Sequence, residues 1–251
     1  MIPPDETTSQ RQDRLLAAED GRQYAVFKAG TGLGSLATTE RIDSVIVNFS
    51  LPSGPALFLN LAYKAFVTYR DVEVPKLFDL HPQGRWPDDV KALFDFCEQY
   101  AAHVIFAFTA LEAFANEVIA NQVVENKYSY TTRRATQRGK PAQKDTYRGE
   151  EIERNVSLNE KLAQVLPDAL SVDSPKGRHI WRDYTNLKRL RDRIIHLKMA
   201  DRAPRGPEVE SIWGDMLRNP KEPFCDNTHK IMGHYGPTVI NRRWHQEYPY
   251  S

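Results

Sequence analysis

The fold is decided by residues 181–198, WRDYTNLKRLRDRIIHLK. Apolar side chains recur there close to the 3.6-residue period of a helix, at Trp181, Tyr184, Leu187, Leu190 (or Ile194) and Ile195. This spacing predicts one amphipathic helix with a single buried stripe. Near its end the helix carries Arg191, Asp192 and His196, in the order Arg-Asp-x-x-x-His. In an ideal helix His196 lies about 140° around the axis from Arg191 and roughly 7.5 Å along it. The two side chains therefore share a cleft only across the helix end or against a second helix.

A second helical pattern runs from about residue 89 to about residue 125, after a start signal at residues 86–89. It starts at Trp86-Pro87-Asp88-Asp89, where proline precedes an acidic first turn. A helix of about 37 residues is on the order of 55 Å long. Its most apolar run, residues 101–115, is interrupted by His103 and Glu112 and is too short to span a bilayer. We expect this helix to lie in a protein core.

These two helices resemble the HEPN superfamily (higher eukaryotes and prokaryotes nucleotide-binding domain). Arg-polar-x-x-x-His late in a periodic helix resembles the family's signature. The upstream segment Phe108–Val123, FTALEAFANEVIANQV, is similar to its earlier core helix in the pattern Ala-Leu-Glu-Ala-Phe-x-Asn. The resemblance covers about residues 88–200. It implies a mainly α fold, an HEPN-like helical bundle, in a family where many members are metal-independent ribonucleases.

The resemblance also implies a site and its partners. RNA would be cut by attack of its own 2′-hydroxyl, at a composite site where the motif helices of a homodimer meet. Arg191 would hold the scissile phosphate and His196 would transfer protons, which suits their chemistry near neutral pH. Asp192 would orient one of them, and Glu112 would pair with Arg191. Further cations that extend the phosphate track would be Arg189, Arg193 and Lys198. Family members often serve as toxins or defence effectors, so an inhibitory partner protein is implied.

Residues 128–148, YSYTTRRATQRGKPAQKDTYR, are strongly basic. The candidate RNA-binding residues in this segment are Arg133, Arg134, Arg138, Lys140 and Lys144. Tyrosines are interleaved with them, and cations beside aromatic rings suit single-stranded RNA. A solvated loop explains the composition equally well. In both cases we expect a long polar connection between helices.

The chain divides into three regions. Residues 1–85 form an N-terminal extension of α/β character, with short strands expected at 24–27 and 42–49. Between these strands Gly30–Gly34 indicates a flexible loop rather than a phosphate cradle, because the glycine spacing matches no dinucleotide or Walker motif. Residues 56–74 fit a helix or strands, and their β-forming side chains favour extended structure.

Residues 86–217 form the HEPN-like domain, with a capping box at Ser157–Glu160 that opens a further helix and a short helix at 208–217. Residues 218–251 are expected to be an irregular tail packed on the bundle.

Composition indicates a cytoplasmic protein. The 251 residues include 41% hydrophobic residues, two cysteines and a net charge of +1. RNA would therefore be bound by local basic patches and not by an overall field. The polar start of the sequence does not resemble a signal peptide. We expect no membrane association, no metal and no other cofactor. A zinc site at Cys225, His229, His234 and His245 lacks the second close ligand pair that such sites carry.

Two other functions stay open beside the endoribonuclease. The first is a non-catalytic HEPN-like module that binds RNA or protein, in which Arg191 and His196 only stabilise an interface. The second is an accessory subunit for a partner that transfers nucleotidyl groups. A histidine at a helix end is often only a favourable charge against the helix dipole.

Overall fold

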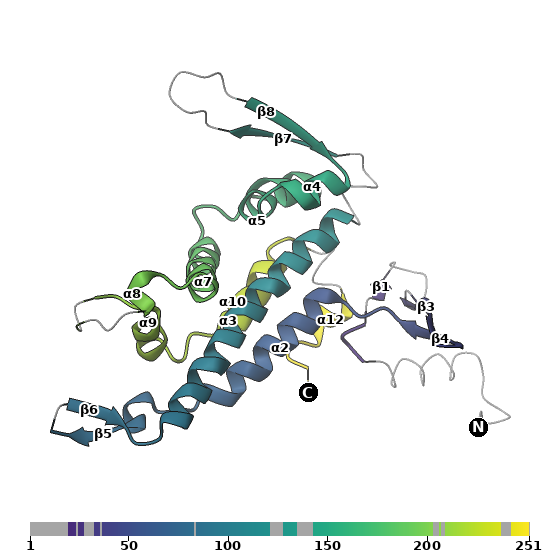
Figure 1. The fold of residues 1–251 in the computed structure, drawn as a ribbon. Coiled ribbons are helices and arrows are strands. Elements are labelled where there is room, and N and C mark those ends of the chain that lie inside the picture. The colour runs from purple at the N-terminus through teal and green to yellow at the C-terminus, as the bar shows by residue number, and fades with distance from the viewer. Residues whose placement is uncertain are drawn as a thin grey trace.

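The computed structural model describes residues 20–23, 25–27, 33–35, 37–82, 84–120, 128–134, 143–202, 206, 209–236 and 242–250. Two long antiparallel helices form its centre, α2 (Gly54–Tyr69) and α3 (Val90–Val118) (Figure 1). Helices α7 (His179–Ile195) and α10 (Phe224–Gly233) pack against this pair. The structure is mainly helical, as the sequence predicts.

Helix α3 runs as predicted but begins later, because Trp86 and Pro87 belong to a strand, β6 (Gly84–Pro87), and the helix starts at Val90. The side chain of Asp89 accepts hydrogen bonds from the N–H groups of Lys91 and Ala92 and so caps the first turn. Residues spaced by three and four along the helix are buried, from Phe96 to Val118. The predicted end near residue 125 lies outside the described residues.

Helix α2 contradicts the prediction of extended structure at 56–74. The hydroxyl of Ser53 accepts from the N–H of Ala56, and a proline occupies the first turn. The residues that pack on α3 follow helical spacing, at Ala56, Leu59, Ala62, Phe66 and Tyr69. Burial along this stripe outweighs the β-propensity of individual side chains, because propensity is weak compared with tertiary packing. The helical core therefore begins at Gly54 and not at residue 86.

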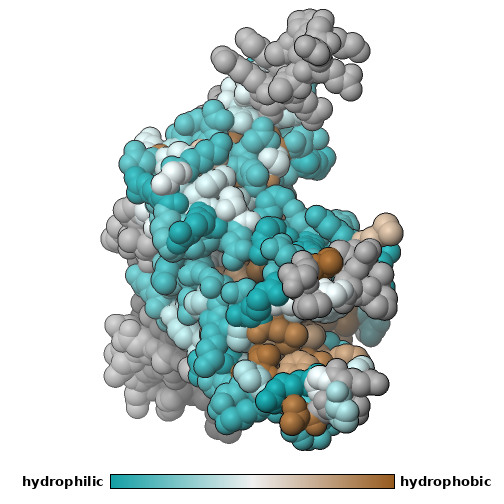
Figure 2. All heavy atoms as spheres, turned by 90° about the vertical axis from the view of Figure 1, so that its left-hand side faces the viewer, coloured by the Kyte–Doolittle hydropathy of each residue, from teal (hydrophilic) through white to brown (hydrophobic). Residues whose placement is uncertain are grey.

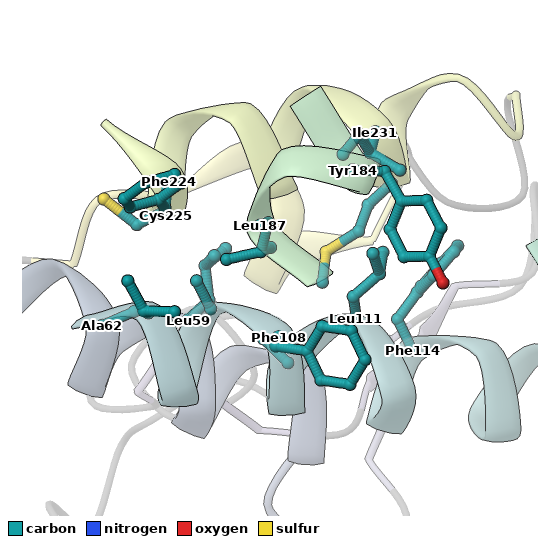
Figure 3. Packing of buried hydrophobic residues seen from close by; sticks show 14 of the residues in the cluster. Leu59, Ala62, Phe108, Leu111, Phe114, Tyr184, Leu187, Phe224, Cys225 and Ile231 are labelled. Atoms are coloured by element: carbon teal, nitrogen blue, oxygen red, sulfur yellow. The ribbon is translucent and has the colours of Figure 1, made fainter. Parts of the chain in front are cut away.

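The core lies between α2 and α3 on one side and α7 and α10 on the other. Figure 3 shows Tyr184 and Leu187 of α7 and Ile231 of α10 above Leu111 of α3. Tyr184, Leu187 and Leu190 are buried as predicted, whereas Ile195 is 45% exposed and does not join the stripe. Helix α10 falls in the region predicted to be irregular. That region packs on the bundle as expected, but part of it is a core helix.

Shorter helices complete the described chain. They are a 3-10 turn (Val74–Leu77), α4 (Glu150–Asn155), α5 (Leu158–Glu160), a π-helical segment (Lys161–Val165), α6 (Leu166–Leu170), α8 (Met199–Arg202), α9 (Ile212–Arg218) and α12 (Arg243–Gln246). The predicted capping box is present, because Ser157 and Glu160 each accept from the backbone N–H of the other. Within the described ranges, no helix has the length and apolar character that crossing a membrane would require.

The described strands pair as two-stranded antiparallel hairpins. The pairs are β1 (Ala25–Phe27) with β2 (Leu33–Ser35), β3 (Ala37–Ile42) with β4 (Val45–Ser50), β5 (Phe78–His81) with β6 (Gly84–Pro87), and β7 (Ser129–Arg134) with β8 (Gln143–Arg148). The strand predicted at 42–49 is confirmed for residues 45–49, which belong to β4, whereas Asp43, at φ 53°, lies in the turn that separates β3 from β4. The sequence predicts a long polar connection at 128–148. The two ends of this segment form the strands of the hairpin β7–β8, which projects from one end of the bundle (Figure 1).

Candidate functional site

Arg191 lies on α7 against the middle of α3. Its guanidinium carbon is 4.6 Å from the centroid of the Phe108 ring, within the range of a cation–π contact. Its Nη1 atom donates to Oδ1 of the neighbouring Asp192 at 3.0 Å. The side chain is 27% exposed, so the guanidinium keeps access to solvent.

Asp192 links Arg191 to the rest of the motif. Its second carboxylate oxygen accepts from the ammonium of Lys188, one turn earlier on α7. Burial alone would raise the pKa of Asp192, but the bonds from Lys188 and Arg191 outweigh it and hold that pKa below its usual value. The carboxylate is therefore ionised near neutral pH and accepts a hydrogen bond from Arg191.

His196 ends α7. Its backbone N–H donates to the carbonyl of Asp192 at 3.0 Å, and its side chain is exposed. The residues that line an open depression of about 630 Å³ at this helix end are Arg189, Asp192, Arg193, His196, Lys198 and Glu210. Arg191 is not among them. Within one copy of the chain, Asp192 is therefore the residue that both contacts Arg191 and lines the same depression as His196.

Two of the predicted phosphate-binding cations have intramolecular partners. Arg193 is 12% exposed, and its guanidinium contacts the carboxylates of Asp201 at 3.0 Å and Asp215 at 3.5 Å and the carbonyl of Glu210 at 2.7 Å. These contacts indicate a structural role, in which Arg193 fixes the chain that follows α7. Arg189 is about half exposed and also contacts Asp215, at 2.9 Å. Lys198 is exposed and lines the depression.

Glu112 does not form the ion pair predicted with Arg191. Among the described residues, Arg191 pairs with Asp192 instead. Burial raises the pKa of Tyr184, and the negative charge of Glu112 adds to this shift. One turn after Glu112, Asn116 accepts a hydrogen bond from the ammonium of Lys161 at 2.8 Å.

Lys161 is a residue that sequence reasoning missed. It is almost fully buried, and its ammonium also donates to the carbonyl of Glu153 at 2.7 Å. Burial lowers its pKa, while the charges of Glu153 and Glu112 act in the opposite direction. Asn116, the second residue of the Glu-x-x-x-Asn spacing on α3, thus has a buried lysine as its partner, and that spacing was the signal available in the sequence.

The basic segment is described only in part. Arg133 and Arg134 belong to β7 and Lys144 to β8, so three of its candidate RNA-binding residues lie on one hairpin. Arg138 and Lys140 lie outside the described residues. Residues 30–32 of the glycine-rich segment also lie outside them.

The residues considered for zinc have other contacts. The ring of His229 stacks on that of His245 with centroids 3.9 Å apart, and His234 bonds to the carbonyl of Asp173. In the part of the chain that the structure describes, no three His, Cys, Asp or Glu side chains converge as a metal site would require.

Comparison of the chain with models of protein families, with curated proteins and with solved structures finds no match.

Proposed function

We propose that this chain is a metal-independent endoribonuclease of the HEPN type that works as a homodimer. The observation that carries the proposal is the arrangement at the end of α7, where a cation, its orienting carboxylate and an exposed histidine follow one another. Arg191 is held by Asp192, and Asp192 lines the same depression as His196. The family resemblance extends the proposal to a toxin or defence effector restrained by a partner protein.

The residues have the chemistry that RNA self-cleavage needs. The 2′-hydroxyl must lose a proton as it attacks the adjacent phosphorus, and the leaving 5′ oxygen must gain one. An exposed imidazole exchanges protons near neutral pH. A guanidinium offers paired donors and a permanent charge to the phosphorane oxygens. In this proposal His196 moves the protons and Arg191 holds the phosphate.

The separate surroundings of Arg191 and His196 favour two copies. Because Arg191 lies over Phe108 while His196 lines the depression, a single copy does not present both groups to one phosphate directly. Two copies related by a two-fold axis would supply a second Arg191 and a second His196.

Exposed apolar residues provide a surface for this pairing. Ile195 and Met199 flank His196 and are 45% and 78% exposed. Leu80 of β5 and Phe94 of α3 are also exposed. Figure 2 shows hydrophobic side chains gathered on the face of the molecule that lies to the left in Figure 1. Apolar groups gathered on a surface often mark contacts between proteins.

The proposal is tested by incubating the wild-type protein and two variants with mixed RNA in excess EDTA. His196→Ala should remove cleavage. His179→Ala is the matched control, because His179 is an exposed histidine on the same helix, and it should cleave as the wild type does. Wild-type products should end in 2′,3′-cyclic phosphate. Cleavage that persists in His196→Ala, or that disappears with EDTA, contradicts the proposal.

A second candidate function is a non-catalytic module that binds RNA or protein. It is favoured by one observation, that Arg191, Lys188 and Arg193 all contact carboxylates of their own chain. Such a module would bind RNA with an affinity that falls steeply with salt, and no product would form.

A further inference from the structure

A pocket of about 520 Å³ lies where α2 meets residues 20–22 and the chain that follows α12. Its walls include Asp20, Arg22, Asn60, Lys64, Glu247 and Tyr250. It shares no residue with the depression beside His196. Its volume falls within the usual size of small-molecule sites, roughly 300–1,000 Å³.

Asn60 is an unsatisfied polar residue in this wall. The side chain is 3% exposed, and its Oδ1 atom has no hydrogen-bond partner among the described residues. Buried polar atoms in folded proteins nearly always have a partner, because leaving one unpaired destabilises the fold. An amide has one acceptor and two donor positions, so a ligand with the complementary edge would satisfy it.

Lys64 adds a positive charge one helical turn from Asn60. Residues four apart lie on the same face of a helix, so both side chains serve the same pocket. The neighbouring charges are already compensated, Arg22 by Asp20 and Glu247 by Arg243. Within the described ranges no carboxylate lies at ion-pair distance from Lys64, which leaves its ammonium available to an anion.

Tyr250 supplies a flat surface. Its hydroxyl donates to the carbonyl of Trp244, which fixes the ring, and the residue is only half-buried. Aromatic side chains held in this way stack on the rings of nucleobases. The pocket thus combines a stacking surface, an unpaired amide and an unpaired cation.

We propose that this pocket binds a nucleoside monophosphate. The phosphate contacts Lys64, the donor–acceptor edge of the base pairs with the amide of Asn60, and the base stacks on Tyr250. An asparagine amide can bond to two positions on one base edge at once, as it does with adenine. The site is separate from the proposed ribonuclease site, and its occupancy does not depend on RNA cleavage.

The test is calorimetric titration of the full-length protein with the 5′-monophosphates of adenosine, guanosine, cytidine and uridine, each without RNA. Inorganic phosphate and the four nucleosides are the partial ligands. At least one monophosphate should bind more tightly than phosphate and than its own nucleoside. Lys64→Gln should weaken this binding roughly tenfold, which is the usual worth of a hydrogen bond to a charged group. Lys64 is exposed, so this variant keeps the fold.

Two further variants make the result specific. Asn60→Ala should weaken binding of the monophosphate while leaving the affinity for phosphate alone unchanged. Lys230→Gln, an exposed lysine on α10 that does not line the pocket, should bind as the wild type does. The proposal is overturned if none of the four monophosphates binds, if phosphate alone binds equally well, or if Lys64→Gln leaves the affinity unchanged.

Discussion

At the scale of single residues, Asp201 shows how the chain after His196 is held. Its carboxylate is fully buried and accepts from Arg193 and from the backbone N–H groups of Lys198 and Ile212. Burial alone would raise the pKa of Asp201, but these donors outweigh it and lower the pKa. Asp201→Asn removes the nearer of the two carboxylates that Arg193 contacts, and we expect the free energy of unfolding in urea to fall by about 3 kcal/mol.

The control is Asp173→Asn, which breaks the exposed ion pair with Arg178. Exposed pairs contribute less than about 1 kcal/mol. Equal losses in the two variants would show that Asp201 is not a buried anchor.

His103 makes the stability of the fold depend on pH. It is fully buried, its Nε2 atom accepts from the N–H of Cys225 at 3.0 Å, and its Nδ1 atom is 2.7 Å from the hydroxyl of Tyr69. Burial lowers the pKa of His103 to about 3 and that of His245 to about 4, from an ordinary value of 6.5. The unfolded chain therefore binds protons that the folded chain excludes.

The stability that neutral His103 and His245 contribute is complete above pH 6.5 and is lost as the pH falls toward 4. Each group adds a slope of about 1.4 kcal/mol per pH unit inside this window. We expect urea unfolding between pH 7 and pH 5 to show this decline. A His103→Gln variant should show a smaller slope. A stability that stays constant across the window would contradict the buried, neutral state of these rings.

At the scale of elements, the α2–α3 contact is the main source of packing. Leu59 is fully buried in it, whereas Leu61 on the same helix is 41% exposed. Leu59→Ala should cost about 2–5 kcal/mol, because it removes apolar contacts and leaves a cavity. Leu61→Ala should cost less than about 1 kcal/mol. Thermal and urea unfolding followed by circular dichroism compare the two, and similar losses would place α2 outside the core.

The elements also show how far the sequence predicts the fold. Helices α3 and α7 were predictable, because each has a long stripe of regular spacing and α3 has a clear first turn. Helix α2 was not, because Phe66, Val67 and Tyr69 are β-formers whose helical state comes from packing on α3. Helix α10 is short and follows prolines. Its apolar residues could be recognised as part of the core only once the structure showed α10 packed beside α7.

The contacts of the candidate site were likewise predictable only in part. Contacts between neighbours on one helix, such as Arg191 with Asp192, follow from the sequence. Contacts between helices do not, because they depend on how the helices are rotated. Arg191 therefore pairs with Asp192 and not with Glu112, and the bond from Lys161 to Asn116 appeared only in the structure.

At the scale of the whole molecule, the proposed dimer can be tested through its apolar surface. Met199→Glu places a charge beside His196 and should convert dimer to monomer, because an unpaired charge is costly to bury. The matched control is Val67→Glu, at an exposed apolar position on α2. Analytical ultracentrifugation reports the mass of each. A dimer that survives Met199→Glu and is lost in Val67→Glu would place the interface elsewhere.

The most direct test of the central claim is to mix two inactive variants, Arg191→Gln and His196→Ala, and to measure RNA cleavage. In a composite site a mixed dimer combines the intact Arg191 of one copy with the intact His196 of the other. We predict that each variant alone is inactive and that the mixture regains part of the wild-type rate. A mixture that forms mixed dimers yet stays inactive, while the wild type cleaves, would contradict a site shared between two copies.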